Sequence, residues 1–307
     1  PHITYQNLDD ADNPLKYAYL GAETWTFLDV DLIYNSDVDT SSISLDSLDN
    51  VHISYIIDVA GGSTEELKFA TLVGDSFQKE TILSEEISFN ATSLDFDSND
   101  KPHISYLTEN FGTLEYVKKV EGTWVWDSEW SIIDRSLDAG KSLSLDIDSR
   151  DIPAIAYKRG TQTDEKLSVS QRIGGGWNQS SVADDVKGHI SLATDSSNLP
   201  HISYESTDYD LVYLHFTGEE WLDQVISSGF DYGDSFHHYG LFSSIEVDSQ
   251  DYPHILCASH DYNYDQFSDI VTEYRYAHYA YLNKAGWQKF DEEAIALSSA
   301  GWYGDIA

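Results

Sequence analysis

Hydrophobic and polar residues along this chain form short runs, each too brief for a typical helix. The runs are rich in β-branched and aromatic residues and are bounded by Gly, Asp, Asn and Ser. No stretch keeps the spacing of apolar residues that marks one face of a helix. The pattern therefore predicts a chain made of β-strands.

One phrase, Pro-His-Ile-Ser-Tyr, recurs in recognisable form. Its copies begin at residues 1, 51, 102, 153, 200 and 253, at intervals of 47 to 53 residues. An Asp stands five residues before each of the later copies, at Asp46, Asp97, Asp148, Asp195 and Asp248. A second fixed interval, the ten residues from Leu114 to Trp124, also returns in every repeat. A period of this length predicts blades or solenoid turns.

Each repeat reads as four short strands. The first has the form Ser-Leu-x-x-Asp, the second is the repeated phrase, the third begins near Leu114 or its equivalent, and the fourth opens at an aromatic residue. Six such units predict an all-β fold, a six-bladed β-propeller of four-stranded antiparallel blades. The chain begins in a second strand and ends in a first strand. We therefore expect both ends to build one composite blade, whereas a solenoid would need capping repeats.

The repeat register also sets the expected boundaries. The blades are expected at residues 304–307 plus 1–32, 41–84, 92–135, 142–183, 190–227 and 243–297, within a single domain of residues 1–307. From the spacing of the other copies, we expect about six residues of one turn to be absent between Ala307 and Pro1. With Pro first and no Met, we expect a mature or excised piece, part of a larger multidomain or assembled surface protein.

The net charge of the chain argues against several classes of binding partner. The chain has 54 acidic and 17 basic residues, a net charge of −37, which argues against nucleic acid or an anionic membrane as partner. No apolar run approaches the roughly 20 residues of a membrane span. Such a surface favours solubility in a salty medium, with cation binding or a basic partner as the alternatives.

The unit Ser-Leu-x-x-Asp-Ser-x-x-x-Pro-His-Ile-x-Tyr resembles the repeat of secreted and surface β-propeller proteins of bacteria and archaea. The resemblance covers nearly the whole chain and implies a propeller located outside the cell or on its surface. In size and blade number the chain is also similar to six-bladed fucose-binding lectins, although their sugar-contacting residues are not matched. The Asp-box of sialidases, Ser-x-Asp-x-Gly-x-Thr-Trp, is absent from the sequence, which counts against a sialidase.

The repeated histidines are interpreted as structural. A reaction needs its base once, whereas a buried hydrogen-bond network is needed in every blade. The histidines are His2, His52, His103, His201 and His254, and the expected partners are the repeated Asp residues. The acidic turns after these Asp residues also look like calcium loops. They lack the glycine of such loops, so Asx-type turns are favoured and bound Ca²⁺ is the alternative.

Loop lengths distinguish two faces of the predicted propeller. Connections on one face keep their length, whereas those on the other vary from 11 to 24 and from 18 to 27 residues between fixed repeat positions. Function is expected on the variable face, because a rigid scaffold presents such loops. The largest insertions lie in the sixth repeat, at residues 230–240 and 260–269.

Aromatic residues mixed with Asp, Asn and Gln suit sugar rings and their hydroxyl groups. The predicted ligand-binding residues are Asp231, Asp234, His237, His238, Tyr239, His260, Asp261, Tyr262, Tyr264, Asp265, Trp302 and Tyr303. Two alternatives stay open. The long loops could pack their own rings as a cap without a ligand, or His237, His238, Asp231 and Asp234 could gather a metal ion.

The function favoured is a non-enzymatic extracellular recognition or adhesion module that binds a glycan or another cell-surface component. The second hypothesis is a polysaccharide-active enzyme. A lyase would need a His or Tyr base and a cation for the uronate, yet the sixth-repeat loops contain no Arg or Lys. A hydrolase would need two suitably spaced carboxylates, and no pair can be chosen from the sequence. A structural surface-layer or filament subunit is the third hypothesis.

Overall fold

A computed structural model of the chain describes its strands and most of its turns. The described residues are 2–6, 15–22, 24–31, 41–59, 64–85, 89–108, 112–126, 132–135, 142–161, 164–231, 235–265, 270–292 and 304–306. All regular secondary structure in these ranges is β-strand, as predicted. Within them, no helix is long and apolar enough to cross a membrane.

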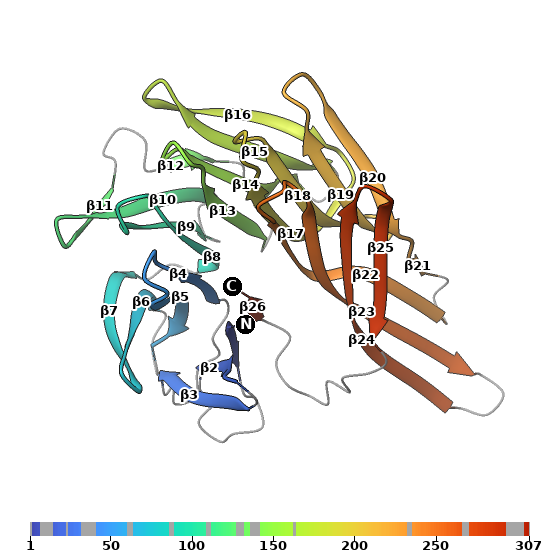
Figure 1. Cartoon of the computed structure of the whole chain (residues 1–307), viewed down its shortest axis with the longest axis horizontal. Coiled ribbons are helices and arrows are strands. Elements are labelled where there is room, and N and C mark those ends of the chain that lie inside the picture. Colours follow the sequence, from blue (N-terminus) through green and yellow to red (C-terminus); the bar gives the residue numbers. More distant parts are fainter. Residues whose placement is uncertain are drawn as a thin grey trace. The chain divides into compact units, whose positions relative to one another are not determined.

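The strands form six sheets (Figure 1). The first sheet contains, in order, β26 (Gly304–Ile306), β1 (His2–Gln6), β2 (Leu15–Leu20) and β3 (Trp25–Asp31). The second contains β4 (Ser41–Leu45), β5 (Val51–Asp58), β6 (Glu65–Val73) and β7 (Ser76–Glu85). The third contains β8 (Phe89–Phe96), β9 (Pro102–Thr108), β10 (Thr113–Val120) and β11 (Thr123–Trp126), with β12 (Ile132–Asp134) also paired to β10.

The second half of the chain repeats this pattern. The fourth sheet contains β13 (Leu143–Ile147), β14 (Pro153–Thr161), β15 (Asp164–Ile173) and β16 (Gly176–Ala183). The fifth contains β17 (Val186–Thr194), β18 (Pro200–Ser206), β19 (Leu211–Phe216) and β20 (Trp221–Ser227). The sixth contains β21 (Phe230–Asp231), β22 (Ser235–Val247), β23 (Pro253–Asp265), β24 (Ile270–Asn283) and β25 (Gly286–Glu292).

Six antiparallel sheets of four main strands are the strand organisation of a six-bladed β-propeller, so the predicted fold class is confirmed. The composite blade is also present, because β26 pairs with β1 and places Ile306 opposite Ile3. Two sheets carry one short strand beyond the predicted four, β12 in the third and β21 in the sixth.

The chain divides into two compact units. One comprises Pro1–Ile155, Ser170–Asn178 and Ser299–Ala307, and the other comprises Ala156–Val169 and Gln179–Ser298. The boundary between them runs through the strands of the fourth sheet. The first three sheets belong to the former unit, and the fifth and sixth belong to the latter.

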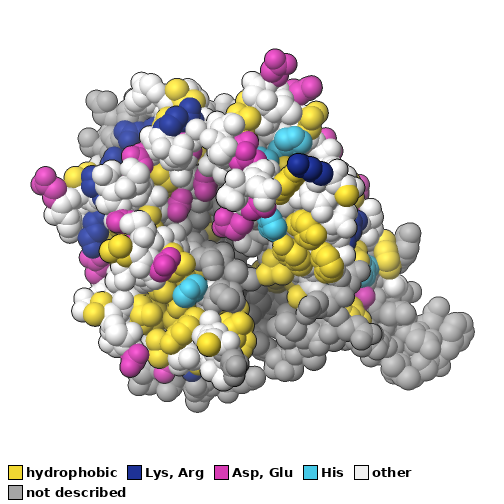
Figure 2. All heavy atoms as spheres, in the orientation of Figure 1, with side chains coloured by type: hydrophobic (Ala, Val, Ile, Leu, Met, Phe, Trp, Pro, Cys, Tyr) yellow, Lys and Arg dark blue, Asp and Glu magenta, His cyan; other side chains and the backbone are white. Residues whose placement is uncertain are grey.

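Acidic side chains are spread over the face seen in Figure 2 rather than gathered in one patch.

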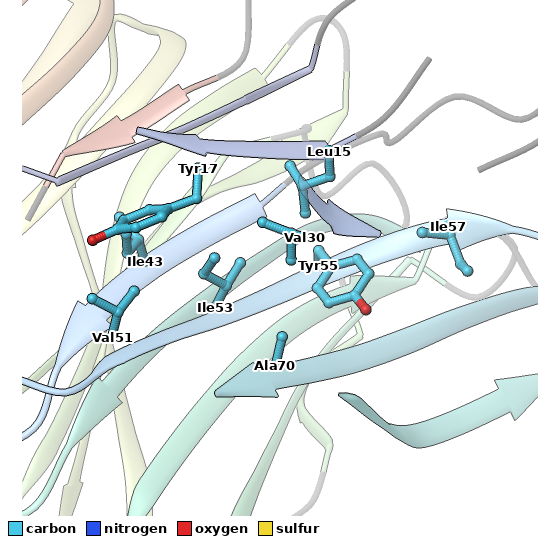
Figure 3. Packing of buried hydrophobic residues seen from close by; sticks show 9 residues of the cluster. All are labelled: Leu15, Tyr17, Val30, Ile43, Val51, Ile53, Tyr55, Ile57 and Ala70. Carbon is cyan, nitrogen blue, oxygen red and sulfur yellow. The ribbon is translucent and has the colours of Figure 1, made fainter. Parts of the chain in front are cut away.

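The apolar side chains are buried between neighbouring sheets. Leu15 and Tyr17 of the first sheet pack with Ile53 and Tyr55 of the second in one such cluster (Figure 3). Cys257 belongs to the corresponding cluster between the fifth and sixth sheets. Burial of this apolar surface is the main force that holds consecutive sheets together.

A repeated aromatic contact links consecutive sheets. The aromatic residue that opens the outermost strand of one sheet meets, edge to face, a ring on the third strand of the sheet before it. The pairs are Phe77 with Tyr17, Trp124 with Phe69, Trp177 with Tyr116 and Trp287 with Tyr213, with ring centroids 5.1 to 5.6 Å apart and planes at 71° to 81°. This geometry explains the fixed ten-residue interval, because edge-to-face contacts demand a set register.

The turn between the first two main strands has one structure in five sheets. Its Asp accepts hydrogen bonds of 2.8 to 3.0 Å through Oδ1 from the backbone N–H groups two and four residues later. These residues are Asp46, Asp97, Asp148, Asp195 and Asp248. The residue three places after each Asp has a φ of 56° to 63°, a left-handed conformation that Asp and Asn adopt readily. The turns are therefore of the predicted Asx type.

Neighbouring turns are joined by a serine and an aspartate. The N–H and hydroxyl groups of Ser98 both donate to the carboxylate of Asp151 in the next turn, at 2.7 and 2.9 Å. The same pair of bonds joins Ser47 to Asp100 and Ser196 to Asp251. We call these pairs the turn clasps.

The repeated histidines lie between these turns and the third strands. His103 is 3% exposed, with Nε2 3.6 Å from Asp97 Oδ2 and Nδ1 bonded to the Tyr116 hydroxyl. The equivalent Nε2 to Oδ2 distances are 3.3 Å for His52 and Asp46, 3.6 Å for His201 and Asp195, and 3.3 Å for His254 and Asp248. Nδ1 contacts a hydroxyl group in these repeats and at His2, where it is that of Tyr17. These contacts agree with a structural role.

Candidate functional site

The sixth sheet has the longest strands among the described residues. β22 and β23 have 13 residues each and β24 has 14, whereas strands in the other sheets have at most 10 (Figure 1). The pairing of β23 with β24 continues to Asp265 opposite Ile270. Residues 235–240 and 260–265, expected in loops, are therefore strand. The expectation was wrong because insertion length alone does not distinguish a loop from an extended hairpin.

The structure brings several of the predicted ligand-binding residues together. His237 and His238 on β22 lie opposite Asp261 and His260 on β23, and Tyr262 lies opposite Phe236. Asp231 is exposed on β21, and Tyr239 continues β22. For Tyr264 and Asp265 the backbone alone is described, as part of β23. Asp234, Trp302 and Tyr303 lie outside the described residues.

A column of rings crosses from the fifth sheet to the sixth. The imidazole of His238 stacks on the Tyr209 ring, with centroids 3.8 Å apart and planes at 11°. Phe236 lies 4.4 Å from His238 and stacks with Tyr262 at 5.1 Å. Tyr209 is held at the start of this column by its backbone, since its carbonyl accepts a 2.9 Å hydrogen bond from Tyr239 N–H. We call these four rings the ring column.

A charged group lies at the Tyr209 end of the ring column. Lys187 Nζ lies 3.6 Å from the centre of the Tyr209 ring and 3.3 Å from Glu205 Oε1. The stacked His238 leaves no room for an ammonium on its side, so Lys187 must cover the opposite face. Glu205 is 1% exposed, and His189 Nε2 lies 3.7 Å from its other oxygen. Tyr209 is therefore sandwiched between Lys187 and His238.

Two carboxylates lie on opposite faces of this part of the sixth sheet. On the face of the ring column, the Tyr209 hydroxyl donates a hydrogen bond to Asp231. On the other face, Asp261 pairs with Nδ1 of His237 and is 30% exposed. Beside them, His278 Nε2 lies 2.7 Å from Ser259 Oγ, and its ring lies 5.0 Å from Tyr239. Ser259 is completely buried, which argues against a role as a nucleophile.

Burial shifts the titration of the acids and bases in this cluster. It lowers the pKa of His238 to about 4, and the nearby Lys187 ammonium adds to the effect. Burial likewise lowers the pKa of His189 to about 4. It raises the pKa of Asp261, against the opposing effect of His237, and that of Glu205, against Lys187. His189 and His238 are therefore neutral at pH 7.

The described part of the cluster does not fit a metal ion. Within those residues, no three His, Cys, Asp or Glu side chains come close enough together to hold one. The Asp261 carboxylate instead forms an ion-pair contact with His237. Nε2 of His238 and Oδ1 of Asp261 are buried and make no hydrogen bond to any residue that the structure describes. A ligand hydroxyl satisfies a group of this kind.

Three members of the cluster come from the fifth repeat and were not predicted from the sequence: Lys187, Glu205 and Tyr209. Lys187 and Glu205 lie on β17 and β18, and Tyr209 lies in the short connection before β19. Of the six connections between a second and a third strand, this one is the shortest in the sequence, so loop length gave no reason to choose its residues. Tyr209 has a φ of 67°, a backbone conformation that bulky residues rarely adopt, which indicates that the surrounding structure fixes its backbone.

No protein-family model matches the sequence, and no curated protein matches it. Solved structures do resemble it in fold. A mutant form of AofleA from Arthrobotrys oligospora is 11% identical over 92% of this chain and 81% of its own, with a TM-score of 0.55. Aleuria aurantia lectin, described as a six-bladed β-propeller with a fucose recognition mode, is 9% identical over 84% of this chain and 95% of its own, at 0.50.

A sialidase is a further structural neighbour. The Hadza microbial sialidase Hz136 is 11% identical over 79% of this chain and 56% of its own, with a TM-score of 0.55. The chain has the fold of a six-bladed β-propeller. At these identities the similarity concerns the fold alone, because propellers of one architecture have many different functions.

Proposed function

We propose that the chain is a recognition module that binds glycans through the ring column and the Asp231 carboxylate beside it, outside the cell or on its surface. The observation that carries this proposal is the placement of Asp231 beside the rings of Tyr209, His238, Phe236 and Tyr262. Rings provide contact area for the apolar faces of sugars, and carboxylates accept hydrogen bonds from their hydroxyl groups.

Two further observations support binding of a sugar. Nε2 of His238, unpartnered among the described residues, is a polar atom in the middle of the cluster. Structural neighbours include a lectin whose fucose recognition is named and a sialidase. Similar architecture alone would be weak support, so the proposal depends on the chemistry of the ring column.

Binding without catalysis is favoured over a lyase. The cluster contains a cation from the fifth repeat, Lys187, which the sixth-repeat loops lack, but Glu205 lies 3.3 Å from its ammonium and already balances its charge. A uronate carboxylate would have to compete with a buried glutamate for that ammonium. The histidine beside it, His238, is packed between Tyr209 and Phe236, a poor position for a base that must reach a substrate proton.

A glycan array tests the proposal with the wild-type protein and Tyr262→Ala. Phe290→Ala is the matched control, because Phe290 is a 51% exposed ring in the same sheet but outside the ring column. We expect binding by the wild type and the control, and about tenfold weaker binding by Tyr262→Ala. Thermal melting of each variant checks that it is folded. Absence of binding by the folded wild type would contradict the proposal.

A further inference from the structure

We infer that Lys187 is a positioning residue of the glycan site: its ammonium, held by the buried Glu205, fixes the Tyr209 ring in the orientation in which the ring column binds the glycan. The inference rests on the proposed function and adds two residues of the fifth repeat to it. It follows from the backbone that aims Lys187, from the contacts that hold its ammonium, and from the face of the Tyr209 ring that it covers.

A β-bulge aims the Lys187 side chain. Val186 of β17 lies opposite Ser206 of β18. The next pair along the two strands is Gly188 with Glu205, so β17 has one extra residue here, Lys187. A bulge of this kind redirects a side chain without ending the pairing of the strands, and bulges are frequent beside functional sites. The direction of the Lys187 side chain is thus set by the backbone.

The Lys187 ammonium is held in place by a buried carboxylate. Glu205 is 1% exposed, and its Oε1 lies 3.3 Å from Lys187 Nζ. β22 of the sixth sheet packs closely against this glutamate, because a Cβ atom at Gly240 would lie 3.2 Å from the Glu205 Cα. Lys158 of the fourth sheet also donates a hydrogen bond of 3.0 Å to the Lys187 carbonyl. Backbone and side chain of Lys187 are therefore both fixed before a glycan binds.

The orientation of the Tyr209 ring depends on what lies against its two faces. Its backbone is held by hydrogen bonds from Tyr209 N–H to the Ser206 carbonyl, 3.0 Å, and from Tyr239 N–H to the Tyr209 carbonyl, 2.9 Å. The ring can still turn about χ1 unless contacts prevent it. Lys187 Nζ lies 3.6 Å from the ring centre and His238 stacks at 3.8 Å, so the two side chains oppose such rotation. A ring fixed before binding loses less entropy when a sugar packs on the column, which strengthens binding.

A double variant, Lys187→Met with Glu205→Gln, tests the inference. It removes both charges and leaves the net charge of the chain unchanged, whereas Lys187→Met alone would leave the buried Glu205 without its cation. We expect the double variant to bind the immobilised glycans of an array about fivefold more weakly than the wild type. Lys187→Arg keeps a cation that can stack on the ring, so it should bind within about twofold of the wild type.

Lys166→Met with Asp184→Asn is the matched control. It removes an ion pair of 3.5 Å outside the ring column, with a lysine side chain 36% exposed against 38% for Lys187. Glycan binding should not change, and thermal melting checks that every variant is folded. Wild-type binding by the folded Lys187→Met/Glu205→Gln protein, equal losses in the control, or no rescue by Lys187→Arg would overturn the inference while the proposed function stood.

A measurement without glycan tests the contact itself. Protons over the face of an aromatic ring resonate upfield, so the Cε protons of Lys187 should be shifted upfield in NMR spectra of the wild type. Tyr209→Leu should abolish this shift. Absence of the shift in the wild type would overturn the inference. An upfield shift together with no binding of any array glycan by the folded wild type would overturn the proposed function instead.

Discussion

Arg150 Nε donates a hydrogen bond of 3.0 Å to Asp148 Oδ2. In four other turns the equivalent oxygen lies 3.3 to 3.6 Å from Nε2 of the repeated histidine. The fourth repeat has Ala154 in place of that histidine. The chain thus places a side-chain nitrogen beside this carboxylate by two different residue types, which argues that the turn needs the polar contact and not the imidazole.

We expect Arg150→Ala to lower the free energy of unfolding by about 1 kcal/mol, because the Asp148 side chain is fully buried while Arg150 is half exposed. Addition of Ala154→His should restore part of the loss by recreating the contact found in the other repeats. Asn99→Ala is the control, since Asn99 occupies the same turn position beside an intact histidine. Urea unfolding measures all three, and no rescue by the histidine would contradict the explanation.

The edge-to-face contact of Trp287 with Tyr213 should contribute strongly to stability. Trp287 also donates a 3.0 Å hydrogen bond from its indole to Gln224 of the fifth sheet. We expect Trp287→Ala to lower the free energy of unfolding by about 2 to 3 kcal/mol, because it removes packing between two sheets. Phe290→Ala, a change at a half-exposed ring of the same strand, should have an effect below about 1 kcal/mol. Similar losses in both variants would contradict this assignment.

Burial lowers the pKa of His103 to about 4, although the nearby Asp97 opposes the shift. An unfolded histidine binds its proton near pH 6.5, so between about 4 and 6.5 the unfolded chain binds more protons at this site. The stability due to neutral His103 is therefore complete above pH 6.5 and is lost as the pH falls toward 4. NMR titration of the imidazole should show no protonation down to about pH 5. His103→Gln should reduce the pH dependence of unfolding in this range.

Gly229 permits a close approach of backbones beneath the ring column. A Cβ atom at this position would lie 2.6 Å from the carbonyl oxygen of His237 and closer still to that of Tyr209. We expect Gly229→Ala to displace Tyr209, weaken glycan binding at least tenfold and destabilise the fold by about 1 to 3 kcal/mol. Gly188→Ala is the control, because a Cβ there meets nothing within 4 Å. Unchanged binding by a folded Gly229→Ala protein would contradict the role given to Tyr209.

The sequence predicted the fold because its repeat is constrained at fixed distances. The interval from Asp97 to His103 is set by one Asx turn, and that from Leu114 to Trp124 by one hairpin and an edge-to-face contact. Each constraint recurs with every blade, so even a single sequence shows it several times. The turn clasps were not anticipated, since Ser98 and Asp151 stand in different repeats and bond only once the blades are side by side.

The candidate site was predicted less completely for a related reason. Residues of the sixth repeat stood out as insertions, yet the segment that contains Phe236, His238 and Tyr239 was expected to be loop although it is strand. Nothing in the sequence distinguishes Lys187, Glu205 and Tyr209. The first two pair within the fifth repeat, and the Tyr209 ring stacks on His238 of the sixth. None of the three belongs to the repeated phrase, so repetition cannot reveal them.

The pairing of β26 with β1 joins residues from opposite ends of the chain, with Ile306 opposite Ile3. Every other sheet is assembled from strands that are consecutive in sequence. Closing so long a loop has a larger entropy penalty than forming a local hairpin, and contacts distant in sequence form slowly. We therefore expect the first sheet to be the last to acquire its full set of strands during folding, after the hairpins of the other five have formed.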